Sequence, residues 1–467
     1  CQCTQPAETY CSKINACVHL QTNSKYCGTC EKSCAQGEKC TGGQCVCNAC
    51  RWFHTGHVER RHLVKVAFSH KQEVWTILVF EGALSWNSIS LASASGIRVM
   101  LAKHDTEGRI LWHKVFLCTG KRCALSDAFI TVDRYDQSYI ALNIESGAID
   151  LHTPRTAAQK TKASLTGRGT LLAKFDPNGE LLWIKVIQSP KIVQLSDMTL
   201  APQNNTLVLA GIFEQSLQTD DLRFQLDQRS GGFLIALDTQ TGSTKWSHIV
   251  QANVIGSINI GATDRGYVLL GFNYRGKMFL NQQEKDASNE STRTKGALTC
   301  WNTQGQLLWE HQIDPGGSQG MIQVFDLIGV GRDHIVVHIT TSRNIVIGAR
   351  TVTRGDVVLV NALLGFSADG TWLWTRYYGT PRSSVVTVSS LRAYDQSRFL
   401  VHLQNDGSIL YGDQKLPNHQ THQSNWMWFL QVDAATGVAR QLFSRDFPIT
   451  YFNNLDFQTQ PAQRVHT

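Results

Sequence analysis

The stretch Ala173-Lys-Phe-Asp-Pro-Asn-Gly179-Glu-Leu-Leu-Trp183 decides the fold, because its pattern recurs along the chain. Each copy is a short apolar run that ends in Asp or Asn, then a glycine turn, then a strand that carries Trp. Asp or Asn can start a turn by bonding backbone amides, and glycine can take the positive-φ position. Each copy therefore predicts a β-hairpin. Five copies end at Trp112, Trp183, Trp246, Trp309 and Trp374, and a sixth keeps its turn at Gly437 but has Gln441 in place of Trp.

The spacing of these hairpins indicates a repeat architecture. The five tryptophans are 71, 63, 63 and 65 residues apart, and another strand pair precedes each hairpin, as in 198–202 and 206–213. Four strands at a fixed period are typical of β-propeller blades, which bury both faces only when packed around an axis. We expect a mainly β protein with six blades and the five tryptophans between blades. Seven blades is the alternative, because Arg51-Trp52-Phe53 and the strand-like segment 454–459 are candidates for closing the ring.

The repeat also resembles a known kind of sequence. The phrase Ala236-Leu-Asp-Thr-Gln-Thr-Gly242-Ser-Thr-Lys-Trp246 is similar to quinoprotein-type and related bacterial propeller repeats, and the resemblance covers residues 62–447. It implies an architecture and no activity, because such repeats occur in enzymes, assembly factors and adhesins alike. Quinone-dependent dehydrogenases of this architecture carry adjacent cysteines under the cofactor. The sequence has no Cys-Cys dipeptide, which counts against that activity.

A cysteine-rich segment precedes the repeats. Eleven of the fourteen cysteines lie in the first 50 residues. Small domains crowded with cysteine replace a large apolar core with covalent cross-links, and they belong to oxidising compartments. We therefore expect a disulfide-rich module at 1–50, a propeller at 51–467, and an exported protein. The Cys27–Cys30 and Cys47–Cys50 pairs also fit a four-cysteine zinc ribbon, but seven further cysteines surround them, so disulfides are favoured.

Cysteine parity sharpens this expectation. Cys118 and Cys123 flank a short local loop and can pair with each other, whereas Cys300 stands alone in a strand-like run. The eleven cysteines of the head can form five pairs, which leaves one cysteine unpaired. Cys1 is the odd one, and a mature chain that begins with Cys looks like a bacterial lipoprotein with a lipid on that residue. The alternative is that Cys1 is merely where the sequence in hand begins. The cysteines expected in disulfides are Cys3, Cys11, Cys17, Cys27, Cys30, Cys34, Cys40, Cys45, Cys47, Cys50, Cys118 and Cys123.

The head resembles a second family. The run from Cys17 through Cys27-Gly-Thr-Cys30 to Cys47 is similar to the stigma-specific cysteine-rich family, related modules of which occur in secreted proteins of myxobacteria and their relatives. Tyr26 stands where that family usually has Asn, and Glu31 where it often has Gly. The resemblance implies export and a compact knot, and it implies no chemistry.

Composition excludes several function classes. The net charge of +7 has no polybasic tract beyond Arg60-Arg61, so nucleic-acid binding is not expected. The sequence contains no run of 18 apolar residues, so no membrane-spanning helix is expected. Each Asp-x-x-Gly turn supplies one carboxylate, whereas calcium needs six to eight oxygens. The histidine groups 54/57/62 and 419/422 lie in polar sequence typical of solvated side chains.

These observations predict no catalytic residues, no metal and no cofactor. We expect an extracellular or cell-surface interaction or structural protein, lipid-anchored through Cys1 at the outer-membrane surface, that binds protein partners or itself. The expected contact surfaces are the propeller rims, the head, and two polar insertions that we expect to be loops, at 155–169 and 282–296. The alternative is a propeller enzyme or glycan-binding module whose rim or channel site no motif reveals.

Overall fold

The computed structural model describes the chain in segments. They are residues 3, 8–31, 38–41, 44–47, 56–86, 89–151, 162–164, 168–201, 205–226, 230–286, 292–316, 320–342, 344–352, 360–379, 387–405, 410–411, 414–415, 426–446 and 455–458. All regular structure in these segments is β. None of them contains a helix that is long and apolar enough to cross a membrane.

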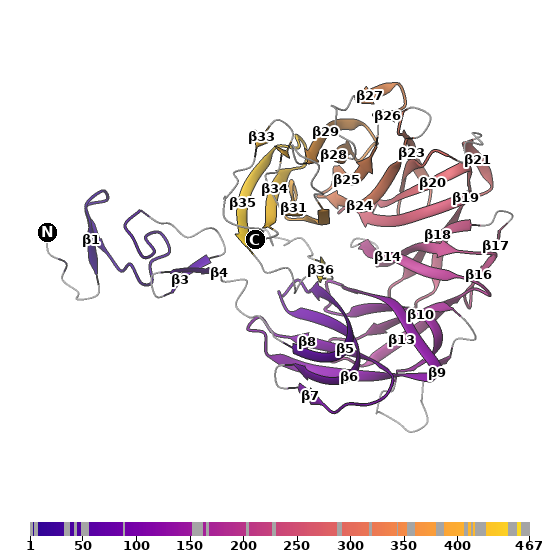
Figure 1. Cartoon of the computed structure of the whole chain (residues 1–467), viewed down its shortest axis with the longest axis horizontal. Coiled ribbons are helices and arrows are strands. Elements are labelled where there is room, and N and C mark those ends of the chain that lie inside the picture. Colours follow the sequence, from indigo (N-terminus) through magenta and orange to yellow (C-terminus); the bar gives the residue numbers. More distant parts are fainter. Residues whose placement is uncertain are drawn as a thin grey trace.

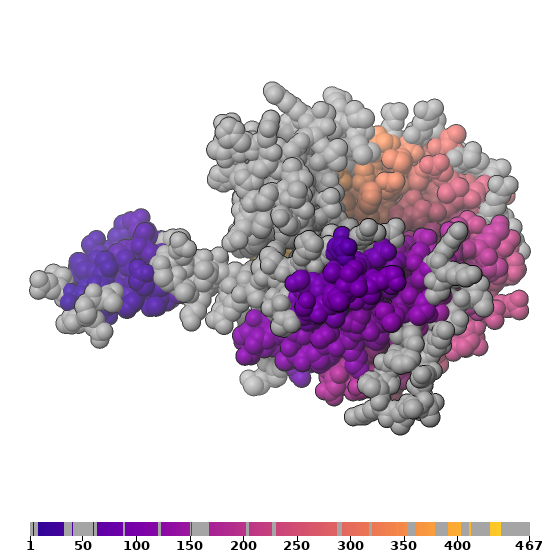
Figure 2. Space-filling model, turned by 60° about the horizontal axis from the view of Figure 1, so that its bottom comes forward, coloured from indigo at the N-terminus to yellow at the C-terminus, as the bar shows by residue number. Residues whose placement is uncertain are grey.

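The N-terminal head is built on sulfur. It has two small antiparallel hairpins, β1 (Thr9–Cys11) with β2 (Ala16–Val18) and β3 (Glu38–Thr41) with β4 (Gln44–Cys47). Among the residues of the head that the structure describes, three disulfides cross-link it, namely Cys3–Cys17, Cys11–Cys30 and Cys27–Cys40. Cys11, Cys27 and Cys40 are each at most 1% exposed, so the cross-links take the place of an apolar core. In Figure 2 the head projects to one side of the β region.

The rest of the described chain forms six consecutive antiparallel units of four strands. Unit 1 comprises β5 (Gly56–Phe68), β6 (Val74–Trp86), β8 (Ile97–His104) and the first half of β9 (Ile110–Val132). Unit 2 comprises the second half of β9, β10 (Ser138–Asp150), β12 (Gly169–Phe175) and β13 (Leu181–Gln188). Unit 3 comprises β14 (Val193–Ala201), β15 (Thr206–Phe213), β18 (Ser230–Asp238) and the first half of β19 (Thr244–Ala262).

The later units repeat this plan. Unit 4 comprises the second half of β19, β20 (Val268–Leu280), β22 (Lys295–Trp301) and β23 (Leu307–Asp314). Unit 5 comprises β24 (Ile322–Val330), β25 (His334–Thr341), β28 (Val360–Ser367) and β29 (Trp372–Gly379). Unit 6 comprises β30 (Thr387–Ala393), β31 (Arg398–Asn405), β34 (Trp426–Asp433) and β35 (Ala439–Asp446).

The units follow one another around a common centre, in a propeller-like arrangement (Figure 1). The first strand of each unit contacts the first strand of the next, from β5 through β9, β14, β19 and β24 to β30. The apolar cores lie between units. One core joins Leu101 of unit 1 to Leu142 of unit 2, and the next joins Leu172 of unit 2 to Leu195 of unit 3. Each unit is therefore stabilised by its neighbours, because neither face of a single sheet is buried alone.

Each of units 2 to 6 pairs with the outer strand of the unit before it, through a short insertion strand or through an extended second strand. Between the second and third strands of unit 3, β16 (Ser216–Gln218) and β17 (Arg223–Gln225) form a hairpin, and β16 pairs with β13 of unit 2. In the same way β26 (Ile345–Ile347) of unit 5 pairs with β23, and β32 (Leu410–Tyr411) of unit 6 pairs with β29. In units 2 and 4 the second strand itself extends onto the outer strand of the preceding unit. The units consequently merge into larger sheets, one of them with 12 strands.

The structure corrects one expectation about the two polar insertions. The insertions at 155–169 and 282–296 were expected to be loops, yet they contain β11 (Lys162–Ser164) and β21 (Gln283–Asp286). These strands pair with the extended ends of β10 and β20. The physical reason is that an extended strand offers a free edge, which a few residues of any polarity can satisfy. Strands of three or four residues are too short for a hydrophobic alternation to reveal them.

A strand from the end of the chain joins the two ends of the ring. β36 (Leu455–Gln458) pairs in parallel with β5 of unit 1 and also contacts β30 of unit 6 (Figure 1). It falls within the segment 454–459 that the sequence indicates as strand-like. The other candidate for closing the ring, Arg51–Phe53, lies outside the described residues.

Candidate functional site

The five repeat tryptophans lie at equivalent places between units. Trp183 of unit 2 shows the arrangement: its Nε1 donates to the carbonyl oxygen of Thr239 in unit 3, at 3.1 Å. Its ring lies against Gly242 of the same turn, where φ is +72° and an added Cβ would meet the ring at 3.1 Å. Trp374 is buried and the other four are half-buried. The other carbonyl acceptors are Pro177 for Trp112, Thr303 for Trp246, Ala368 for Trp309 and Ala434 for Trp374.

An exposed leucine precedes four of these tryptophans. Leu111, Leu182, Leu308 and Leu373 are 43–50% exposed. Each is the extra residue of a β-bulge, so that in unit 2, for example, Trp183 pairs with Lys174 and Leu181 with Phe175. A bulge residue is left out of the ladder and turns its side chain aside. The leucines are thus a consequence of strand geometry, and they do not converge on a site.

A buried ion pair lies beneath the tryptophan of unit 1. Lys103, opposite Trp112 in register, is 6% exposed, and Asp136 of unit 2 is 1% exposed. The Lys103 Nζ forms ion pairs with Asp136 and, at 2.9 Å, with Glu73 Oε2, while Trp75 Nε1 donates to Asp136 at 3.1 Å. Burial alone would lower the pKa of Lys103, but hydrogen bonds to Asp136 and Glu73 raise it above its usual range. This lysine is held charged.

The equivalent lysine of unit 2 has a neutral acceptor. Lys174 lies opposite Trp183 in register, is 3% exposed, and donates from Nζ to the Thr239 carbonyl oxygen at 2.6 Å. Its Nζ also lies 5.2 Å from the ring centre of Tyr139. Burial lowers the pKa of Lys174, and the charges of Asp133 and Asp238 offset this only in part. The one carbonyl of Thr239 thus accepts from both Lys174 and Trp183.

A third polar group lies where unit 5 faces unit 6. His338 of β25 and Tyr378 of β29 are each 2% exposed, and their ring centres are 5.9 Å apart. His338 Nε2 approaches Asn361 Oδ1 at 3.3 Å, whereas His338 Nδ1 and the Tyr378 hydroxyl are buried and have no hydrogen-bond partner among the residues that the structure describes. Burial lowers the pKa of His338 to about 4 and raises the pKa of Tyr378 far above its usual range. Ionisable groups with strongly shifted pKa values cluster at functional sites, so this group is a candidate for one.

The surroundings of this His338–Tyr378 group link it to both units and to the surface. Asp326 of unit 5 accepts the backbone N–H of Leu391 in unit 6 at 2.7 Å. The ring of Phe325, which is 47% exposed, stacks on His338 at 5.4 Å between centres. An aromatic side chain at the surface therefore covers a buried base. Sequence reasoning missed this group, because a histidine and a tyrosine 40 residues apart carry no spacing signal.

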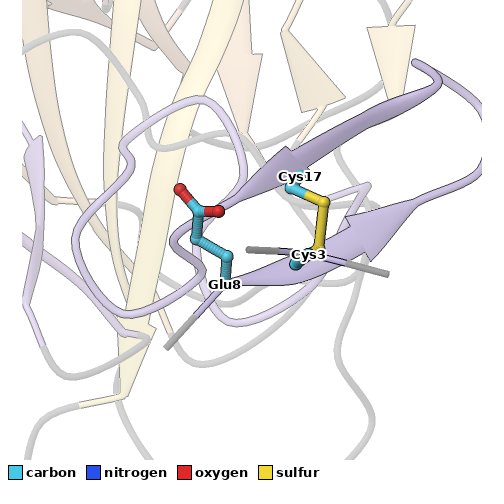
Figure 3. Close-up of side chains that lie close together, drawn as sticks. All are labelled: Cys3, Glu8 and Cys17. Atoms are coloured by element: carbon cyan, nitrogen blue, oxygen red, sulfur yellow. A yellow bond between two sulfur atoms is a disulfide. The ribbon is translucent and has the colours of Figure 1, made fainter. Parts of the chain in front are cut away.

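The cysteines show what the head can and cannot bind. Among the described residues, a possible metal-ligand group is Cys3, Glu8 and Cys17, whose ligand atoms lie within 4.8 Å of one another (Figure 3). The two sulfur atoms are bonded to each other, so no thiolate remains to hold a metal. Cys27 and Cys30 are likewise bonded, to Cys40 and Cys11, which removes one pair of the zinc-ribbon alternative.

The remaining cysteines divide into three cases. Cys118 and Cys123 are joined to each other, and Cys300 is free and buried. Burial raises the pKa of the Cys300 thiol to about 12, so it is no nucleophile at neutral pH. Cys1 and the histidines at 54, 419 and 422 lie outside the described residues. The same holds for the side chains of Cys34, Cys45, Cys47 and Cys50, and for those of the histidines at 57 and 62.

Comparisons with known proteins find only distant likeness. No family model matches the chain, and no curated protein matches it. A solved structure of rhamnogalacturonan lyase YesW resembles it with a TM-score of 0.30 and 9% identity, over 82% of this chain and 76% of that one. The exotype rhamnogalacturonan lyase YesX gives a TM-score of 0.26 and 10% identity, over 83% of each chain. Likeness at this level assigns no activity.

Proposed function

We propose that this protein is an exported interaction scaffold that binds protein partners, or copies of itself, through its rims and its cysteine-rich head. The observation that carries the proposal is the sulfur-built head. Three disulfides hold a segment whose buried residues are largely its own cysteines. Such a segment keeps its shape only in an oxidising compartment, which supports a role outside the reducing cytosol.

The β region supplies the rigid part of this scaffold. We take its six units as the blades of a six-bladed propeller that both ends of the chain close. In support, the start of β5 pairs with the end of β6, as the outer half of β9 pairs with the end of β10. Residues 56–58 thus occupy the place of an outer strand that would precede unit 1. β36 then joins the first strands of units 6 and 1.

The proposal is tested on protein at its native level in its source cells. Rapid alkylation before reduction, followed by peptide mapping, should find Cys3, Cys11, Cys17, Cys27, Cys30 and Cys40 blocked in disulfides. Cross-linking of intact cells should join the head or the rim turns to another envelope protein or to a second copy. Reduced head cysteines would contradict export, and a chain that protease added to intact cells cannot reach would contradict a place at the cell surface.

A second candidate function has one observation in its favour. The His338–Tyr378 group has two buried polar atoms without a partner among the described residues, and the exposed ring of Phe325 stacks on His338. This arrangement suits a module that binds a small polar ligand or a glycan at the boundary of units 5 and 6. Screening of glycans by thermal shift, with Phe325→Ala as the matched variant, decides the point. A ligand that stabilises the wild type and not the variant would favour this second function over the scaffold.

A further inference from the structure

Lys103 and two carboxyl groups form a cluster between units 1 and 2. Lys103 lies in β8 of unit 1, Glu73 lies in the turn between β5 and β6, and Asp136 lies in the turn between β9 and β10 of unit 2. The Lys103 Nζ contacts a carboxyl oxygen of each acid, and Glu73 also forms a hydrogen bond with Asp136. An amine, a carboxyl carbon and a second carboxyl group therefore meet at one place.

Aromatic side chains surround this cluster. Trp75 is 0% exposed and donates from Nε1 to Asp136 Oδ1 at 3.1 Å, and the Lys103 Nζ lies 5.4 Å from the centre of its ring. The ring of Trp112 meets Trp75 edge to face, with 5.1 Å between the ring centres. Asp136 is 1% exposed and has a φ of +62°, which is uncommon for a residue with a side chain. The carboxyl group of Asp136 is therefore fixed against the amine, away from water.

These surroundings favour a condensation between the amine of unit 1 and the carboxyl group of unit 2. The ion pair becomes a neutral pair when one proton moves from the Lys103 Nζ to Asp136, and the net charge of the cluster does not change. Apolar surroundings penalise separated charges, so burial brings the neutral pair closer in free energy to the ion pair than it is in water. The neutral amine is a nucleophile. Its fixed contact with the carboxyl group replaces a collision between two reactants.

We propose that Lys103 and Asp136 condense to an amide, which links β8 of unit 1 covalently to a turn of unit 2. The Lys103 Nζ bonds to the Asp136 Cγ, the bond between Cγ and its hydroxyl oxygen breaks, and one water molecule leaves. Glu73 takes a proton from Nζ and returns it to the leaving hydroxyl, so the reaction needs no oxidant and no second reactant. The ion pair is the state before condensation, so its effects on stability belong to the uncondensed chain. This inference does not depend on the proposed function.

The test follows the intact mass of the folded full chain during incubation, after its disulfides have been reduced and alkylated. We expect a species about 18 Da below the sequence mass to accumulate, because one water is lost. Peptide mapping should find residues 103 and 136 in one cross-linked product, and trypsin should no longer cleave after Lys103. Lys174 is the internal control, because it has the equivalent register position but donates to a carbonyl, and it should stay unmodified. A sample incubated in the unfolded state should keep its full mass.

Variants assign the roles within the cluster. Lys103→Met should show no loss of mass. Glu73→Gln keeps the size of the side chain but removes the proton acceptor, so condensation should slow by about 100-fold or more. Glu107→Gln makes the same change at an exposed acid of unit 1 and should condense at the wild-type rate.

Three outcomes count against the proposal. A folded wild type that keeps its full mass and a free Lys103 would overturn the amide, and this result needs no variant to fold. The same loss of mass in Lys103→Met would also overturn it, because the water would then come from another group. Equal rates in the wild type and Glu73→Gln would remove Glu73 from the reaction.

Discussion

Units 1 and 2 differ in how they accommodate a buried lysine side chain. Each buries a lysine opposite its tryptophan, Lys103 in unit 1 and Lys174 in unit 2. Lys103 has two carboxylates as partners, whereas the hydrogen bond from Lys174 goes to a backbone carbonyl. The pKa of Lys103 is raised and that of Lys174 is lowered. In these two units the pKa of the buried amine is raised where the neighbouring unit supplies a hydrogen-bonded acid, and lowered where it supplies a backbone carbonyl.

Units 3, 4 and 5 have no lysine at this position. The same register position holds Ala236 in unit 3, Cys300 in unit 4 and Gly365 in unit 5. Their tryptophans still donate to the turn of the next unit, as in unit 2. The tryptophan contact is thus the constant element of the repeat, and the lysines are local additions to it.

The largest expected effect comes from removing that constant element. Trp183→Ala and Trp112→Ala should each lower the free energy of unfolding by about 3–5 kcal/mol, because a large aromatic side chain is lost from between two units. Leu182→Ala, at the exposed bulge residue, should change it by no more than about 0.5 kcal/mol. Chemical denaturation of the three variants measures this. If Leu182→Ala proved as costly as Trp183→Ala, the contact between units would not be what the tryptophan supplies.

The next test breaks the partner of the charged lysine. Asp136→Asn should cost about 3 kcal/mol, because the positive charge of Lys103 then stays buried with Glu73 alone. Adding Lys103→Met to Asp136→Asn should recover most of the loss, since the charge goes too. The double-mutant cycle by chemical denaturation gives the coupling energy. A coupling near zero would mean that Lys103 gains nothing from the acid of unit 2.

His338 extends the comparison to a base with no acid partner. In the folded protein His338 has a pKa of about 4, whereas in the unfolded chain its pKa is the ordinary 6.5. Stability should therefore be complete above pH 6.5 and fall as the pH drops toward 4, by roughly 3 kcal/mol at most. His338→Phe should reduce this acid limb, of which His402, with a pKa that burial also lowers to about 4, keeps a part, and should leave stability at pH 8 nearly unchanged. Equal acid limbs in the two proteins would contradict the burial of a neutral His338.

The smallest effects distinguish the two lysines by their pH dependence. Because the folded pKa of Lys103 is raised, its stabilisation is complete below the ordinary pKa of 10.5 and is lost as the pH rises through its folded pKa. The lowered pKa of Lys174 gives the opposite sign, so stability rises with pH between its folded pKa and 10.5. Lys103→Met should remove a falling alkaline limb, and Lys174→Met a rising one. At pH 7 Lys174→Met should gain about 1 kcal/mol. Identical slopes in denaturation from pH 8 to 11 would show that the two sites do not differ.

The sequence reveals the parts of this molecule that depend on local chemistry. The Asp-x-x-Gly turns and the cysteine spacing are local signals, and they predict a mainly β chain with a disulfide-rich start. The repeat locates one tryptophan per copy but not the carbonyl that each one reaches, which belongs to a turn some 60 residues further on. The strand at Lys162–Ser164 is invisible beforehand, because its pairing depends on the edge of β10. His338 and Tyr378 meet only through the register of β25, β28 and β29.

The pairing of insertion strands with the preceding unit has a consequence for the order in which the chain folds. In units 2, 4 and 5 the outer strand gains its last partner from an insertion of the unit that follows, and the first strand of unit 1 gains β36. The outer strands of units 2, 4 and 5 are therefore fully paired only after the next unit is synthesised, and β5 gains β36 only after residue 458 is synthesised. Late contacts of this kind delay the completion of the fold during synthesis. That delay suits the export proposed for this protein, because a chain crosses a translocation pore before it folds.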